Sequence, residues 1–373
     1  MSVTVCEKNK CTGCNACVNI CPKKCISLVD NVKSLDAVID KDLCINCKLC
    51  EKVCQVVNTE NKLIKFQTPI GVYEGATKID EINKESSSGG FATTLGYEFA
   101  KSGGYVVGIK SDKESFYFDI TNNPEEVKLF AGSKYVKVST RDIYKSIKTK
   151  LVENKKVLFF GVPCQVAGLK LYLQKEYPNL YTVDLICHGT PSEKVLLKYL
   201  NERGVENTKN LRFRVKHDCK LSTTDENNKK LITFCDSYTM GFLDGIFYTE
   251  NCYECKYARK DRISDITIGD SWGSKIVGKD GHYYLSLAIV NNEKGEFLKS
   301  LMANSFDFYE KDYEEAIAIN GQLSHPSVKT HKMDYYFEHF NDMTTYKIMK
   351  KKCHKMVLRK RIKWVLVKLH LKK

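Results

Sequence analysis

The chain has 373 residues, 43% of them hydrophobic, which suffices for a small module and one large domain with a buried core. Its net charge of +14 would suit a nucleic-acid-binding protein, but residues 350–373 hold 11 of the 59 Lys and Arg residues and no acidic one. The other 48 basic residues are nearly balanced by 45 acidic ones. Because the body is almost neutral, we expect no nucleic-acid partner.

Cysteine usage points to an intracellular metal-binding protein. The chain contains 17 cysteines, and ten of them lie within the first 54 residues. No apolar run is as long as a membrane-spanning helix, and the first residues lack the basic-then-apolar pattern of a secretory leader, so we expect a cytoplasmic protein. Clustered cysteines in such a protein bind metal more often than they form disulfides.

Residues 1–60 contain a repeated four-cysteine run, and residues 26–29 and 37–39 between the two copies are predicted to form short strands. The copies are Cys11-x-x-Cys14-x-x-Cys17-x-x-x-Cys21 and Cys44-x-x-Cys47-x-x-Cys50-x-x-x-Cys54. In two-cluster ferredoxins the last cysteine of each run ligates the other 4Fe–4S cluster. We therefore assign one cluster to Cys11, Cys14, Cys17 and Cys54, and a second to Cys44, Cys47, Cys50 and Cys21.

Zinc is the alternative metal for these cysteines, but zinc sites typically use Cys-x-x-Cys pairs rather than doubled four-cysteine runs. Pro22 follows the first run, as is typical, whereas Gln55 takes the equivalent place after the second run. Cys6 and Cys25 lie outside the pattern, and we interpret them as small buried hydrophobic residues.

From residue 70 to about residue 345, short apolar runs alternate with helical patterns. We expect strands at residues 70–73, 105–109, 157–160 and 181–186, with helices between them and a further helix that begins at Pro191. This order predicts a partly parallel sheet covered by helices. Residues 211–240 favour irregular β structure.

A second group of cysteines follows the predicted strands of this domain. Cys164 and Cys187 each come directly after a strand, so neighbouring parallel strands would bring both thiols to one edge of the sheet. A helix N-terminus also stabilises a thiolate. With Cys252 and Cys255 they form a candidate four-cysteine site; the alternative is two core cysteines and a separate redox or zinc pair. The cysteines without a partner at ligand spacing are Cys219, Cys235 and Cys353.

Further motifs follow the first cysteine run in a fixed order. They are Ser88-Gly89-Gly90, Gly132-Ser133-Lys134-Tyr135, Gly161-Val162-Pro163-Cys164-Gln165, Cys187-His188-Gly189-Thr190-Pro191-Ser192, Cys252-Tyr253-Glu254-Cys255 and Asp265-Ile266-Thr267-Ile268-Gly269-Asp270-Ser271-Trp272-Gly273. Together they resemble the beta-subunit family of coenzyme F420 hydrogenases and dehydrogenases. The resemblance implies an α+β protein with a two-cluster ferredoxin module over residues 1–60. A mixed α/β domain over residues 70–345 would then hold FAD and a third 4Fe–4S cluster, on Cys164, Cys187, Cys252 and Cys255.

No G-x-G-x-x-G motif follows a strand, so the flavin would be bound by two other polar segments, residues 88–90 and residues 133–135. In the first of these, glycines let backbone N–H groups approach a phosphate, and the following helix adds its positive end. Without the resemblance, a serine-rich loop that caps a helix is the simpler interpretation. Asp270 and Trp272 either line the same site or are structural. The candidate flavin-binding residues are Ser88, Gly89, Gly90, Ser133, Lys134 and Tyr135.

Clusters carry single electrons, whereas a flavin also exchanges electron pairs with organic substrates. We therefore expect an oxidoreductase that exchanges electrons between ferredoxin, or another electron-transfer protein, and a two-electron substrate. The alternatives are a relay subunit that serves a partner enzyme and a true coenzyme F420 oxidoreductase. A metal-binding regulator is disfavoured because no DNA-binding motif lies outside the basic tail.

The tail, residues 346–373, is predicted to form one basic amphipathic helix. It would either lie on an anionic membrane surface, making the protein peripheral there, or pack on the body. Its apolar stripe consists of Leu358, Ile362, Val365, Leu366 and Leu369.

Overall fold

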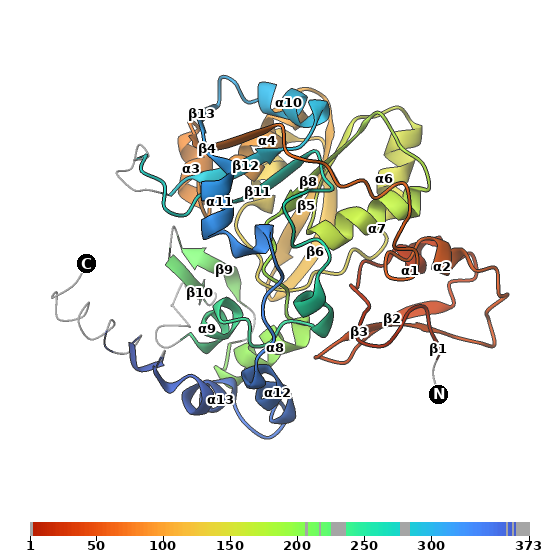
Figure 1. The fold of residues 1–373 in the computed structure, drawn as a ribbon, viewed down its shortest axis with the longest axis vertical. Helices are drawn as coiled ribbons and strands as arrows, with labels where there is room; N and C mark the ends of the chain where they lie inside the picture. The colour runs from red at the N-terminus through yellow and green to blue at the C-terminus, as the bar shows by residue number, and fades with distance from the viewer. Residues whose placement is uncertain are drawn as a thin grey trace.

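The computed structural model describes residues 3–205, 208–215, 218–224, 236–276, 284–355, 357–359 and 362. An N-terminal module, a large central sheet with helices on both faces, and a smaller group of helices with a hairpin lie side by side (Figure 1). Within the described residues, none of the helices combines the length and the apolar character needed to cross a membrane.

The module is built around a three-stranded antiparallel sheet in the order β1-β3-β2. The predicted strands at residues 26–29 and 37–39 correspond to β2 and β3. The turn between them is fixed by Asp30, whose carboxylate accepts a hydrogen bond from the Val32 backbone N–H at 2.7 Å. The module's elements are β1 (Val3–Thr4), α1 (Ala16–Ile20), β2 (Ile26–Asp30), β3 (Leu35–Ile39) and α2 (Leu49–Lys52).

The central sheet has eight strands in the order β13-β4-β12-β11-β8-β7-β5-β6. Four neighbours, β5, β7, β8 and β11, are parallel, and the outer strands are antiparallel, so the predicted partly parallel sheet is confirmed. The strands are β4 (Gly71–Thr77), β5 (Tyr105–Asp112), β6 (Ser115–Thr121), β7 (Val157–Phe160), β8 (Leu180–Leu185), β11 (Ile266–Asp270), β12 (Ser286–Val290) and β13 (Phe306–Glu310).

Successive side chains of a strand point to opposite faces of the sheet, and in these strands both sets are apolar. Helices therefore cover both faces. Val106 and Leu158 pack with α4, whereas their neighbours Val107 and Val157 pack with α6 and α7 on the opposite face. The helices of the large domain are α3 (Asp80–Glu85), α4 (Phe91–Lys101), α5 (Pro124–Val127), α6 (Ile143–Val152), α7 (Pro163–Leu173), α8 (Glu193–Glu202), α10 (Glu293–Ser300) and α11 (Tyr313–Ile319).

The start of α8 differs from the prediction. Pro191 is not its first residue, because Ser192 caps the helix by accepting a hydrogen bond from the Lys194 backbone N–H at 3.0 Å. Short 3-10 helices lie at Lys128–Phe130, Glu250–Glu254 and Gly321–Leu323.

A smaller group of elements packs below the sheet in Figure 1 and includes the predicted irregular β region. It comprises β9 (Lys209–Val215), β10 (Asp218–Thr224), α9 (Ser237–Leu243), α12 (His331–Glu338) and α13 (Thr345–Lys352), and α8 lies beside them. Helix α13 ends at Lys352, and helical conformation resumes after Cys353 at residues 354–355, 357–359 and 362, so the predicted single helix is interrupted at Cys353. The other half of the predicted tail helix lies outside the described residues. The described residues include two members of its apolar stripe, Leu358 and Ile362, which are 56% and 51% exposed.

Candidate functional site

The first cysteine group lies where the module contacts the large domain. Cys14 and Cys17 each lie close enough to Cys11 and Cys54 to interact electrostatically, so the last cysteine of the second run joins three of the first run. Cys6, predicted to be only a buried residue, is buried but also contacts this group. The Cys6 thiol lowers the pKa of Cys54 to about 6. The group therefore contains a fifth thiol.

The second cysteine group surrounds a hollow of about 340 Å³, including its open mouth. The hollow is lined by Cys21, Cys44, Cys47 and Cys50, so the exchange of the fourth cysteine is reciprocal. Cys25 also lies here, with its sulfur 3.4 Å from that of Cys21. Cys47 is exposed, unlike the cysteines of the first group, which are buried. The second group is thus the one that faces solvent.

The third cysteine group lies at the carboxyl ends of the parallel strands. Cys164 is at the start of α7, directly after β7, and Cys187 follows β8. Cys252 lies in the 3-10 helix Glu250–Glu254 and Cys255 directly follows it. All four line one hollow of about 890 Å³, including its open mouth. Residues far apart in the sequence therefore meet at one place, as the strand order predicted.

Burial dominates the electrostatics of this third group. It raises the pKa of Cys164 and raises that of Cys187 to about 12. Desolvation therefore opposes the helix N-terminus that was predicted to stabilise the Cys164 thiolate. Among the described residues, no three His, Cys, Asp or Glu side chains are arranged to hold a single metal ion.

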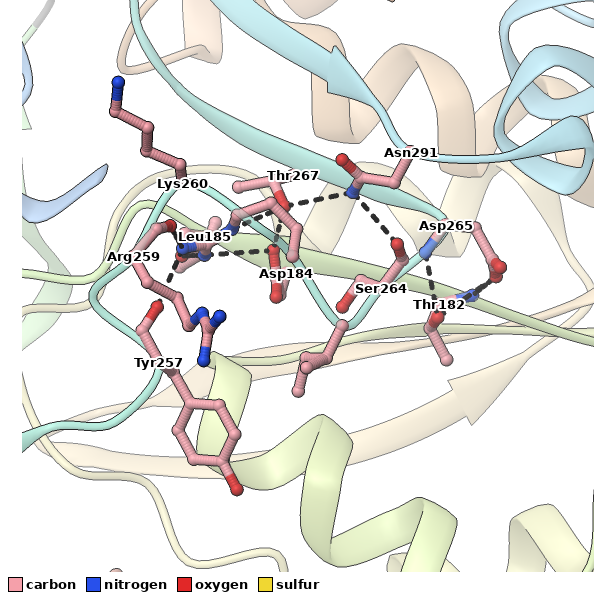
Figure 2. A network of polar contacts seen from close by, with 12 residues as sticks. Thr182, Asp184, Leu185, Tyr257, Arg259, Lys260, Ser264, Asp265, Thr267 and Asn291 are labelled. Atoms are coloured by element: carbon pink, nitrogen blue, oxygen red, sulfur yellow. Dashed lines mark hydrogen bonds and ion pairs between the residues drawn. The ribbon is translucent and has the colours of Figure 1, made fainter. Parts of the chain in front are cut away.

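A buried polar network supports the turn that follows Cys255 (Figure 2). The Arg262 guanidinium donates to the carbonyls of Tyr257 and Arg259 at 2.8 and 3.2 Å. It also forms an ion pair with Asp184 of β8 at 3.5 Å, and both side chains are almost completely buried. Thr267 donates to the same carboxylate at 2.5 Å. The network fixes the cysteine-bearing loop to the sheet.

Gln55 joins the first and third groups, although the sequence suggested only that it replaces a proline. Its side-chain amide donates to the Cys164 carbonyl at 2.7 Å, and its side-chain oxygen accepts a hydrogen bond from the Tyr257 hydroxyl at 2.5 Å. Lys256 donates to the Gln55 carbonyl at 2.7 Å. The residue next to Cys54 is therefore bonded to a residue of the third group.

Helix α7 also approaches the module closely. A Cβ at Gly168 would lie 2.7 Å from the Cβ of Cys14 and 2.9 Å from its sulfur. Only glycine leaves room for the cysteine loop at this point.

Residues 132–141 cross the whole site, and we call them the crossing segment. At one end the Ser133 backbone N–H donates to the Ser87 hydroxyl at 2.9 Å. In the middle, the Lys137 side chain lines the third-group hollow and donates to the Thr12 carbonyl at 3.1 Å. At the far end, Thr140 donates to the Cys14 carbonyl at 3.0 Å. One stretch of chain thus contacts Ser87, in the serine-rich loop that precedes α4, and two cysteine groups.

The electrostatic surroundings of Lys137 are unusual for a buried cation. Burial alone would lower its pKa, whereas Cys164, Cys252, Cys187 and Cys11 raise it when they are charged as thiolates.

The candidate flavin segments adjoin one another at the same sheet edge. Ser88 shares a hydrogen bond with Ser286 at 2.9 Å, between the two hydroxyls. A Cβ at Gly89 would lie 2.1 Å from the Gly75 carbonyl oxygen, so packing on the sheet requires a glycine here whatever the loop binds. Gly90 caps α4 with φ 81°. The loop is therefore a structural helix cap as well as a candidate phosphate site.

The second candidate segment is largely engaged within the protein. The Lys134 amine donates to the carbonyls of Phe130 and Ala131 at 2.7 and 2.8 Å, and burial lowers its pKa to about 7. The Tyr135 ring is stacked on Phe242, with ring centroids 4.2 Å apart. One face of this ring is therefore occupied.

A polar cluster beside Tyr135 includes Asp270 and Trp272, the two residues that the sequence suggested either line the flavin site or are structural. Arg214, nearly buried, donates to both carboxylate oxygens of Asp270 at 2.9 and 2.8 Å, and its guanidinium lies 5.9 Å from the Trp272 ring centroid. Its Nε atom is buried and has no hydrogen-bond partner among the described residues. Sequence reasoning missed Arg214, because nothing in the local pattern of β9 marks it.

Two cysteines expected to be isolated have only weak polar neighbours. The Cys219 sulfur lies 3.8 Å from the Tyr135 hydroxyl, and buried Cys353 lies 3.9 Å from an Asp244 carboxylate oxygen. Cys235 lies outside the described residues.

Known families match both parts of the chain. Residues 10–58, which contain the first two cysteine groups, match the family described as a 4Fe-4S dicluster domain. Residues 154–316, which contain the third group, match the family described as the C-terminal part of the coenzyme F420 hydrogenase/dehydrogenase beta subunit. The chain therefore combines a match to a 4Fe-4S dicluster domain with a match to the C-terminal part of the coenzyme F420 hydrogenase/dehydrogenase beta subunit, which confirms the resemblance.

Individual relatives are distant. The coenzyme F420-dependent sulfite reductase of Methanocaldococcus jannaschii is 25% identical over 309 residues, covering 79% of this chain and 46% of that protein. This chain thus spans about half the length of that relative. An uncharacterised protein of the same organism is 23% identical, covering 87% of this chain and 95% of its own length.

One solved structure shares the fold. It is a chain of the F420-reducing NiFe hydrogenase complex from Methanosarcina barkeri, with a TM-score of 0.51 and 15% sequence identity. The likeness covers 79% of this chain and 94% of that one.

Proposed function

We propose that this protein is an iron–sulfur flavoprotein oxidoreductase that passes electrons between ferredoxin-type clusters and a two-electron substrate through FAD. The observation that carries the proposal is the third cysteine group. Its four thiols converge at the carboxyl edge of the sheet, where open α/β sheets bind ligands, and the module's first group lies against it.

The donor sets fit three 4Fe–4S clusters. Each group supplies four thiols, the ligand set of a cubane cluster, and two of the groups exchange their fourth cysteine as two-cluster ferredoxins do. We assign the third cluster to Cys164, Cys187, Cys252 and Cys255. Because the second group faces solvent, it is the place where a ferredoxin or another electron-transfer protein would exchange electrons with the chain.

The flavin would lie at the same sheet edge, where it would convert between single electrons and electron pairs. We retain Ser88, Gly89, Gly90, Ser133, Lys134 and Tyr135 as the residues that would hold it. Two observations support this location: the two segments are hydrogen-bonded to each other through Ser87, and the buried Arg214 Nε leaves a donor for a polar ligand beside Tyr135.

A relay subunit is the second candidate function, and the relatives favour it. The sulfite reductase is about twice as long as its matched region, and the solved neighbour is part of a hydrogenase complex. A substrate site could therefore reside on a partner protein, and coenzyme F420 is one candidate reactant. We expect a cytoplasmic location, with the tail as a candidate contact for an anionic membrane surface.

Anaerobic reconstitution with iron, sulfide and flavin analysis tests the proposal. The full chain should hold about twelve irons, four for each cluster, together with flavin. Cys164→Ala and Cys255→Ala should each lose about four irons, whereas Cys219→Ala should lose none. Equal iron contents in all three variants would contradict the third cluster. Turnover without a partner would favour the enzyme over the relay.

A further inference from the structure

Lys137 lies between the first and the third cysteine groups. Its side chain lines the third-group hollow together with Cys164, Cys187, Cys252 and Cys255. Its amine donates to the carbonyl of Thr12, which directly follows Cys11 of the first group. The residue is only 8% exposed. It is thus a buried cation that belongs to neither group alone.

The groups that could compensate the charge of Lys137 are cysteine thiolates. Its electrostatic neighbours are Cys164, Cys252, Cys187 and Cys11, which represent both groups. Within the described part of the chain, no carboxylate forms an ion pair with it. A buried charge without an opposite charge nearby is unfavourable, so negative charge that arises at these thiols would compensate this lysine.

A 4Fe–4S cluster with four thiolate ligands is such an interaction partner. It carries net negative charge, and reduction adds one electron. Net charge and nearby hydrogen bonds set the reduction potential of a cluster, and a nearby cation favours the reduced state.

We propose that Lys137 is a shared electrostatic residue that raises the reduction potentials of the first and third clusters together and leaves the second cluster unaffected. The proposal rests on the three-cluster function proposed above. By acting on donor and acceptor alike, the lysine shifts both potentials in the same direction and so preserves the difference between them while one electron moves, oxidising one cluster and reducing the other.

A purely structural role is the alternative, in which Lys137 only clamps the Thr12 carbonyl. Lys137→Gln separates the two roles, because glutamine retains an N–H donor and removes the charge. Lys137→Met removes both. Lys170 offers a matched control, since its amine also donates to a backbone carbonyl, that of Ile263, and its electrostatic neighbours include no cysteine.

The experiment is a redox titration of the anaerobically reconstituted full chain, followed by electron paramagnetic resonance. In Lys137→Gln, the equilibrium constants for reduction of the first and third clusters should each fall at least about tenfold, which is about 59 mV for one electron. The second cluster serves as an internal reference and should not shift. Lys170→Met should leave all three potentials unchanged.

The outcomes separate this inference from the proposed function. If the unmodified protein holds no third cluster, both are overturned. If three clusters are present and Lys137→Gln shifts none of them, or shifts all three equally, the shared electrostatic role alone is overturned. Lys137→Met should reproduce the shift of Lys137→Gln, so a shift confined to Lys137→Met would assign the residue to clamping.

Discussion

The close approach of α7 to the first cysteine group makes Gly168→Ala an informative variant. The added methyl group would lie 2.7 and 2.9 Å from the Cβ and sulfur of Cys14, and 3.1 Å from the Tyr144 hydroxyl. Since carbon atoms at rest lie about 3.5–4.0 Å apart, the helix and the cysteine loop must separate by roughly 1 Å. Such overpacking costs about 1–3 kcal/mol.

Whether Gly168→Ala stabilises or destabilises the protein tests the close packing of α7 on the cysteine loop. In an unobstructed helix, alanine would stabilise the protein by about 0.8–1.0 kcal/mol relative to glycine. The clash should reverse this gain, so we expect Gly168→Ala to be destabilised by about 1 kcal/mol, and Gly168→Val by more. Because the strain falls on Cys14, the paramagnetic spectrum of the first cluster should change and that of the second should not.

The assay combines urea denaturation of the anaerobic holoprotein, followed by circular dichroism, with spectra of the reduced clusters. A variant that is more stable than the parent by the full helical gain, with an unchanged spectrum of the first cluster, would refute the close packing of α7 on the cysteine loop.

Three further variants test other features. Arg262→Ala should lower the free energy of unfolding by about 3–5 kcal/mol because it leaves Asp184 buried without its partner; Asp184→Asn in the same chain should restore part of the loss in a denaturation experiment. Gly89→Ala should lower both flavin content and thermal stability because its Cβ meets the sheet backbone, and flavin loss without destabilisation would instead favour direct phosphate contact. If the tail binds an anionic membrane, the full chain should float with anionic vesicles at low salt and a chain ending near residue 348 should not; recovery of both in the soluble fraction would leave packing as the explanation.

The cysteine groups could be anticipated because their spacing is local and chemically specific. Two four-cysteine runs predict the exchange of Cys21 and Cys54, and apolar strands before Cys164 and Cys187 predict that these thiols meet at one sheet edge. Each cysteine run spans few residues, so its spacing can be recognised in the sequence. The rule that parallel strands bring their carboxyl ends to one edge of the sheet depends only on the direction of the chain.

The contacts between the parts could not be anticipated. Lys137 and Gln55 lie in no motif, and their roles depend on partners more than a hundred residues away. Pro191 misled the prediction of α8 because proline also suits the residues just before a cap. Arg214 was missed because a buried arginine and a surface arginine look the same in a strand sequence.

The module and the large domain share one hydrophobic core, in which Val5, Ala16 and Val53 of the module pack in the same cluster as Tyr144 and Val166 of the domain. A carrier domain that swings between donor and acceptor needs a weak, polar seam that can open. This chain has the opposite arrangement, so the spacing of its redox centres is built in rather than sampled. If the protein exchanges electrons with an external partner as proposed, diffusion is left to that partner, and the rate of electron exchange should then depend on ionic strength.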